Sequence, residues 1–135
     1  MKIVLRPKAE SDNATLIALF PGMEQGLAHA RTRDSIPIGA TDQDNADLAE
    51  HIPGSLIGTT YSQIVSEHRA LRFVAINGTL PDIDAMITGR YPYAKRLYFI
   101  AARHPTKETT DFLAFLSTPD GRQAMRDSGL VACPN

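Results

Sequence analysis

Short apolar runs alternate along the chain with segments whose apolar residues recur every three or four positions. The runs at residues 3–5, 55–60, 71–76 and 96–102 predict strands. The last run is apolar almost without interruption, which is typical of a strand buried on both faces. The recurring pattern predicts helices at residues 13–20, 23–33, 42–52, 61–68, 81–88, 107–117 and 119–128.

Local signals frame these segments. Thr41, Thr106 and Thr118 stand where helix N-caps are expected, and Asn77-Gly78 is a turn dipeptide. Because strands and helices alternate, we predict an α/β fold with a mixed, mostly parallel sheet flanked by helices. The length favours a single domain over residues 1–135. We expect 71–76 and 96–102 to be central strands, on which three side chains of the next helix pack: Phe112, Phe115 and Leu116.

The opening stretch carries the best candidate for a binding site. A strand ending at Arg6 is followed by a polar loop and by a helix that we expect to begin near Asn13. The first N–H groups of a helix have no internal partner and attract anions, and an arginine fork suits two oxygens of a phosphate-like group. The hydroxyls of Ser11 and Thr15 can add single hydrogen bonds. The alternative is a simple helix cap beside a solvated arginine.

Composition narrows the classes of function. The net charge of -1 and the pI of about 6.4 remove the electrostatic case for nucleic acid. No apolar run approaches the roughly 20 residues that span a bilayer, and Met1-Lys2 does not open a signal peptide. The single cysteine, Cys133, excludes an internal disulfide, and the four histidines lack metal-ligand spacing. We therefore expect no metal and no cofactor.

Five short motifs occur in a familiar order. Pro53-Gly-Ser-Leu-Ile-Gly58, Asn77-Gly-Thr-Leu-Pro81, Gly89-Arg-Tyr-Pro92, the paired-helix run at 112–123 and a closing Gly129-Leu-Val resemble the second half of phosphate-type periplasmic binding proteins of ABC transporters. The resemblance implies a lobe of the type II periplasmic-binding-protein fold. It also implies that the chain is a fragment or shortened form of a two-lobed protein, located in the periplasm and working with an ABC permease.

The resemblance assigns roles to residues of the opening stretch. Arg6 matches the arginine that binds the tetrahedral oxyanion, and Ser11-Asp12-Asn13 stands where the family has Ser-Gly-Thr, after a loop one residue longer. The same cleft would be lined by Thr41-Asp42 and Thr59-Thr60-Tyr61, although helix capping offers a simpler role for Thr41. Asp12 departs from the family pattern. A carboxylate beside the anion disfavours binding unless the ligand carries a proton that Asp12 can accept.

Two other functions compete with an uptake system for phosphate or a related oxyanion. One is a stand-alone sensor of small anions that acts as a homodimer. In either case we expect the isolated chain to self-associate through Tyr91, Tyr93 and the last two helices, because a lobe without its partner lobe leaves apolar surface uncovered. The other is an enzyme, but the chain lacks a Gly-x-Ser-x-Gly elbow, a P-loop, a paired-His motif and a Gly-rich dinucleotide turn. We therefore expect a binding protein without catalytic activity.

Overall fold

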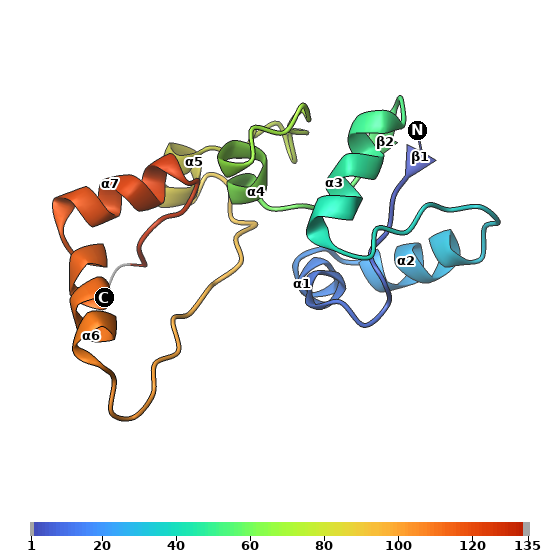
Figure 1. Ribbon diagram of the computed structural model, residues 1–135. Coiled ribbons are helices and arrows are strands. Elements are labelled where there is room, and N and C mark those ends of the chain that lie inside the picture. Colours follow the sequence, from blue (N-terminus) through green and yellow to red (C-terminus); the bar gives the residue numbers. More distant parts are fainter. Residues whose placement is uncertain (1, 134–135) are drawn as a thin grey trace. The chain divides into compact units, whose positions relative to one another are not determined.

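A computed structural model describes residues 2–133, which form a mixed α/β protein (Figure 1). The chain divides into two compact units, Met1–Arg72 and Phe73–Asn135. Whether they make one domain stays a prediction. The elements are β1 (Lys2–Ile3), α1 (Ser11–Leu19), α2 (Met23–Arg31), α3 (Asp42–His51), β2 (Ser55–Leu56), α4 (Tyr61–Ser66), α5 (Ile83–Ile87), α6 (Lys107–Leu116) and α7 (Pro119–Asp127).

The first unit contains the sheet. β1 and β2 pair in parallel, with Ile3 beside Leu56. An isolated parallel bridge joins Leu5 to Ile38, so the segment before α3 lies on the other side of the first strand. Pro37, next to this bridge, fits an outer position because it has no N–H to donate. The predicted parallel pairing is confirmed in this small form.

The core of the first unit is made of small and medium apolar side chains. Val4 and Leu5 are almost completely buried, as are Ala46 and Ala49 on α3. The alanines let α3 lie close to β2, which it contacts (Figure 1). Such a core offers little apolar area for a unit of this size, so polar contacts carry more of its organisation.

Arg69 supplies the densest of those polar contacts. It lies just after α4, and its side chain is only 14% exposed. It pairs with Asp47, with Glu50 at 3.5 Å and with Glu67 at 2.7 Å. The Glu67 carboxylate also accepts hydrogen bonds from the side chains of Gln43 and Gln63. The cluster therefore fastens the end of α4 to α3.

The predicted helices and their start signals are largely confirmed. Thr41 caps α3 in a capping box, because its hydroxyl accepts from Asp44 N and its own N–H donates to the Asp44 carboxylate. Thr106 and Thr118 are simple N-caps of α6 and α7: each hydroxyl accepts a hydrogen bond from the backbone N–H three residues later. One start was wrong: α1 begins at Ser11, with Glu10 as its N-cap, rather than near Asn13.

The two central strands that the sequence predicted do not form in the described residues. Residues 71–76 and 96–102 form neither a helix nor a strand, apart from a bridge between Ile76 and Thr79 around the turn at Asn77-Gly78. Val74 is 60% exposed and Ile100 is 96% exposed. The prediction of two buried central strands was wrong. Apolar runs become strands only when another strand satisfies their backbone groups, and no described segment lies in position to do so.

The packing predicted for α6 was also wrong. Phe112 is 51% exposed and Phe115 is 44% exposed, while Leu116 is half-buried. The described part of this unit has no sheet, and α6 contacts α7 instead. A ring contact between Phe112 and Phe99 remains, with centroids 6.0 Å apart. Gly121 allows the close turn between the two helices, because an added Cβ would lie 2.1 Å from the Phe115 carbonyl oxygen.

Replacing Arg69 with Gln should raise the pKa of Glu67. The hydrogen bond from Arg69 is the main cause that holds this pKa below its usual range. Because the folded-state pKa is lowered, the contribution of Glu67 to stability is present above the unfolded pKa and is lost as pH falls through the folded value. This acid-dependent loss should be smaller in Arg69→Gln. Carboxyl chemical shifts followed from pH 7 to 2 test this, with exposed Arg72→Gln as the control; an unchanged Glu67 titration would contradict the cluster.

Candidate functional site

Arg6 lies at the centre of the candidate site. It follows the β1 segment and is 8% exposed. Its Nη1 donates to the Gly39 carbonyl oxygen at 2.8 Å. Its Nη2 pairs with the carboxylate of Asp42 at 3.0 Å and with that of Glu10 at 3.4 Å. One guanidinium therefore joins the first strand, the segment before α3 and the starts of two helices.

One edge of this guanidinium is only partly used. Nε is buried and has no hydrogen-bond partner among the described residues. Nε and Nη2 point their hydrogens in parallel from one edge of the planar fork, which is the edge that binds two oxygens of a carboxylate or phosphate. Here Nη2 meets two separate carboxylates and Nε meets none. A single anion with two suitably spaced oxygens would satisfy both nitrogens.

The two carboxylates on Arg6 stand at helix N-termini. Glu10 is the N-cap of α1, and Asp42 is the first residue of α3. Negative charge is favoured at both positions by the helix dipole. Their side chains are accessible, with 39% of Glu10 and 58% of Asp42 exposed. The site thus already binds anionic oxygens, and they come from the chain itself.

Gly39 contacts Arg6 directly, and the buried Asn45 packs closely against Gly39. The carbonyl of Gly39 accepts from Arg6, and a Cβ at Gly39 would lie 2.5 Å from the backbone N and Cα of Asn45. Asn45, on α3, is 2% exposed and donates from Nδ2 to the Gly58 carbonyl oxygen at 3.1 Å. Its Oδ1 has no partner in the described part of the chain. Only glycine allows α3 to approach this closely.

The predicted site residues are partly brought together. Arg6 and the start of α1 are neighbours, as expected. The Asn13 side chain, however, donates to the carbonyls of Pro7 and Lys8, and the Thr15 hydroxyl donates to the Ser11 carbonyl. The Thr41 hydroxyl caps α3. These three side chains hold the local backbone in the structure.

Ser11 and Asp12 open α1, and each has an interaction of its own. Sequence reasoning missed Glu10, Gly39 and Asn45. The pairing of Glu10 with Arg6 could have been predicted from the sequence, because Glu10 lies four residues after Arg6. Asp42 follows the predicted cap Thr41 directly, so its place at a helix N-terminus was readable but its approach to Arg6 was not. Nothing local marks Gly39 or Asn45 as neighbours.

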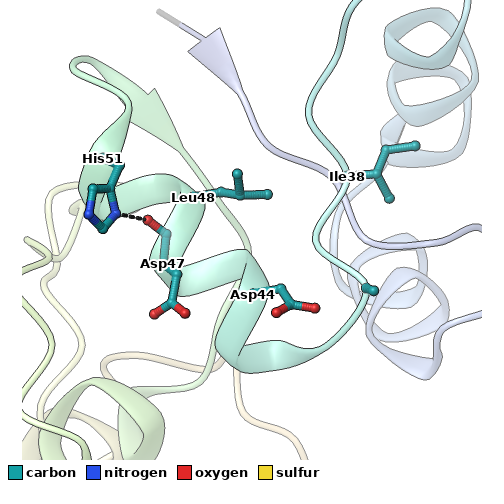
Figure 2. Close-up of a pocket in the computed structure, with 6 residues that line it drawn as sticks. Ile38, Asp44, Asp47, Leu48 and His51 are labelled. Carbon is teal, nitrogen blue, oxygen red and sulfur yellow. Dashed lines mark hydrogen bonds between the residues drawn. The ribbon is translucent and has the colours of Figure 1, made fainter.

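A cavity of about 400 Å³ lies beside α3 (Figure 2). Asp44, Asp47, Leu48 and His51 line it from the helix, and Ile38, toward which Leu48 extends, lines it from the preceding segment. The His51 Nδ1 is 2.7 Å from the Asp47 carbonyl oxygen, so the neutral ring carries its proton on Nδ1. Within residues 2–133, no group of three His, Cys, Asp or Glu side chains is arranged to hold a metal ion.

A second cavity, of about 440 Å³, lies where α2 ends. Arg31, Arg33 and Asp34 line it together with apolar side chains. Arg31 donates from Nη2 to the Arg6 carbonyl oxygen at 2.8 Å. The guanidinium groups of Arg31 and Arg33 make this second cavity the main competitor of the Arg6 site for an anion.

Comparisons with known proteins add no relative: no protein-family model, no curated protein and no solved structure matches the chain. None of the helices in the described residues is long and apolar enough to cross a membrane.

Replacing Gly39 with Ala should destabilise the first unit by about 1–3 kcal/mol, because the new methyl group overlaps the backbone of Asn45. Gly26→Ala is the matched control. Gly26 lies within α2 with no atom near the position of a Cβ, so there alanine should stabilise by roughly 0.5–1 kcal/mol through helix propensity. Denaturant unfolding measures both. If Gly39→Ala leaves the free energy of unfolding unchanged, or changes it in the same way as Gly26→Ala, the close approach of α3 is contradicted.

Proposed function

We propose that this chain is one lobe of the substrate-binding component of an ABC-type uptake system, and that it binds phosphate or a related oxyanion at Arg6. The observation that carries the proposal is the Nε–Nη2 edge of Arg6. This edge lies between the starts of α1 and α3, and its buried Nε has no partner among the described residues. The order of sequence motifs supports the same role. In this proposal the protein belongs to the periplasm and delivers its ligand to a permease.

An arriving oxyanion has to displace carboxylates from Arg6. The Asp42 side chain is the easier to move, since more than half of it is exposed. One ligand oxygen would then take the place of its Oδ1 on Nη2 and another would reach Nε. Because this exchange replaces existing ion pairs, the net gain is small. We expect a dissociation constant in the millimolar range, where the binding free energy is about -4 kcal/mol.

The same carboxylates select among ligands. Asp12 lies in the first turn of α1, and Glu10 and Asp42 lie on Arg6. Hydrogen phosphate carries a proton that a neighbouring carboxylate can accept, so it gains a hydrogen bond where sulfate meets only repulsion. Hydrogen phosphate should therefore bind more tightly than sulfate near neutral pH. Binding of either ion should weaken as salt is added.

The test is an amide-shift titration with phosphate and with sulfate. Phosphate should move the amides of residues 10–15 and 39–42, and Arg6→Ala should abolish these shifts. If Arg6→Ala does not fold, Arg6→Lys replaces it in the titration. Lysine keeps the positive charge but lacks the planar fork of donors, so phosphate binding should weaken. Arg72→Ala, which removes an exposed charge from the same unit, should leave it unchanged. Shifts confined to residues 31–38 would locate the anion in the second cavity and contradict the proposal.

Asp42→Asn tests the selectivity. It removes the carboxylate nearest to Arg6 but keeps the side-chain shape. Sulfate should bind several-fold more tightly, because its repulsion falls, and the preference for phosphate should narrow. An unchanged ratio of the two affinities would show that Asp42 does not face the ligand.

A second candidate function is a small-anion sensor that acts as a homodimer. It is favoured by a separate observation, the exposed apolar segment of the second unit, in which Ile100 is almost fully exposed. The anion site would be the same in both cases. The two functions differ in whether the chain delivers its ligand to a permease.

A further inference from the structure

The most exposed apolar segment of the molecule is the run at residues 96–102. Leu97, Tyr98, Phe99 and Ile100 are consecutive and are 63%, 77%, 67% and 96% exposed. Figure 1 draws this stretch as a long connection without helix or strand between α5 and α6. Soluble monomers rarely expose four large apolar side chains in a row. Contiguous patches of this kind usually mark interaction surfaces.

The backbone of this segment is unused as well. Among residues 2–133, no backbone hydrogen bond joins residues 96–102 to another segment. The run is rich in aromatic and apolar residues and contains no proline. It therefore combines a strong tendency to form a strand with free donors and acceptors, which is the property of an edge that recruits another strand.

One face of the segment is already engaged. Phe99 makes an edge-to-face contact with Phe112 on α6. In a paired strand successive side chains point to opposite sides, so Leu97 and Ala101 would share the side of Phe99, while Tyr98 and Ile100 would share the other. The pair with the higher exposure, Tyr98 and Ile100, would then lie on the side away from α6.

We propose that two copies of this chain associate by pairing their 96–102 segments as antiparallel strands around a two-fold axis. A single strand can be its own partner in this arrangement, because a two-fold contact uses the same surface on both copies. The four exposed side chains present roughly 600 Å² per copy, so the pair buries at most about 1,200 Å², the lower end of the range for specific interfaces. The other surface that the sequence suggested, at Tyr91, Tyr93 and the last two helices, stays a separate prediction. The proposal does not depend on the anion site.

Charge at the ends of the segment selects the register. The axis of such a pair passes between two copies of one residue. With Phe99 on the axis, Lys95 would lie opposite the partner's Arg103, and like charges directly opposite are unfavourable. With Tyr98 on the axis, Lys95 lies opposite the partner's Ala101.

The Tyr98 register has further advantages. It pairs Tyr98 with its own copy and Leu97 with the partner's Phe99, and both are favourable cross-strand pairs. An axis at Ile100 would instead place Arg96 opposite the partner's His104. We therefore place Tyr98 on the axis. Because positive charges still gather near the strand ends, added salt should strengthen the association.

Sedimentation equilibrium over a wide concentration range tests the association. Wild type should form dimers, more so at high salt, and Ile100→Lys should raise the dimer dissociation constant at least about tenfold. Ile100 is so exposed that its replacement has little to disturb within one copy. Leu80→Lys is the matched control, since Leu80 is an exposed apolar residue of the same unit outside the segment, and it should leave the constant unchanged. A monomer at all concentrations, or equal effects of the two variants, would overturn the proposal.

Cysteine cross-linking tests the register. Tyr98→Cys, Phe99→Cys and Ile100→Cys are made separately in a Cys133→Ser background and oxidised. Directly opposed residues meet the Cα separation that a disulfide needs, so the dimer of Tyr98→Cys should cross-link fastest. Fastest cross-linking at Phe99→Cys or Ile100→Cys would overturn the Tyr98 register. Equal rates at the three positions would overturn the paired strand itself.

Discussion

The Arg6 guanidinium holds the first unit of this protein together at one point. It bonds the segment before α3 through Gly39 and receives the carboxylates of Glu10 and Asp42 from the starts of α1 and α3. A positive charge that is 8% exposed needs such compensation, because a buried unpaired charge is strongly unfavourable. The arrangement is nevertheless incomplete, since Nε keeps no partner in the described chain. The candidate function follows from this one incomplete edge.

Structure and function make opposing demands on the same contacts. The carboxylates that keep Arg6 compensated in the absence of ligand are the groups that an oxyanion must displace. In the proposed function the affinity is therefore low, and the preference for a protonated anion is a consequence of the same carboxylates. A second lobe, if one closes over the site, would add donors and exclude water, which strengthens each remaining contact.

Local signals in the sequence predicted the helices well and the sheet poorly. Thr41, with Asp44 three residues later, predicted the start of α3 correctly, because a capping box depends only on residues close together in the sequence. The run at 96–102 was read as a buried strand from its apolar continuity, but burial depends on a partner strand that this pattern does not specify. Arg6 was identified from its position before a helix. Its contact with Asp42 is set by the packing of α3, held by Gly39 and Asn45, and no local pattern encodes that.

The most direct test of the central claim is the side-chain Nε–H signal of Arg6 in ¹H–¹⁵N spectra recorded during a phosphate titration. This proton has no acceptor in the absence of ligand among the described residues, so its environment differs from that of an exposed arginine. The account predicts that the Arg6 Nε–H resonance moves downfield and becomes protected from exchange as phosphate binds, because an oxygen then accepts from it. If phosphate shifts the signals of Arg31 and Arg33 while that of Arg6 stays unchanged, the site proposed at Arg6 is contradicted.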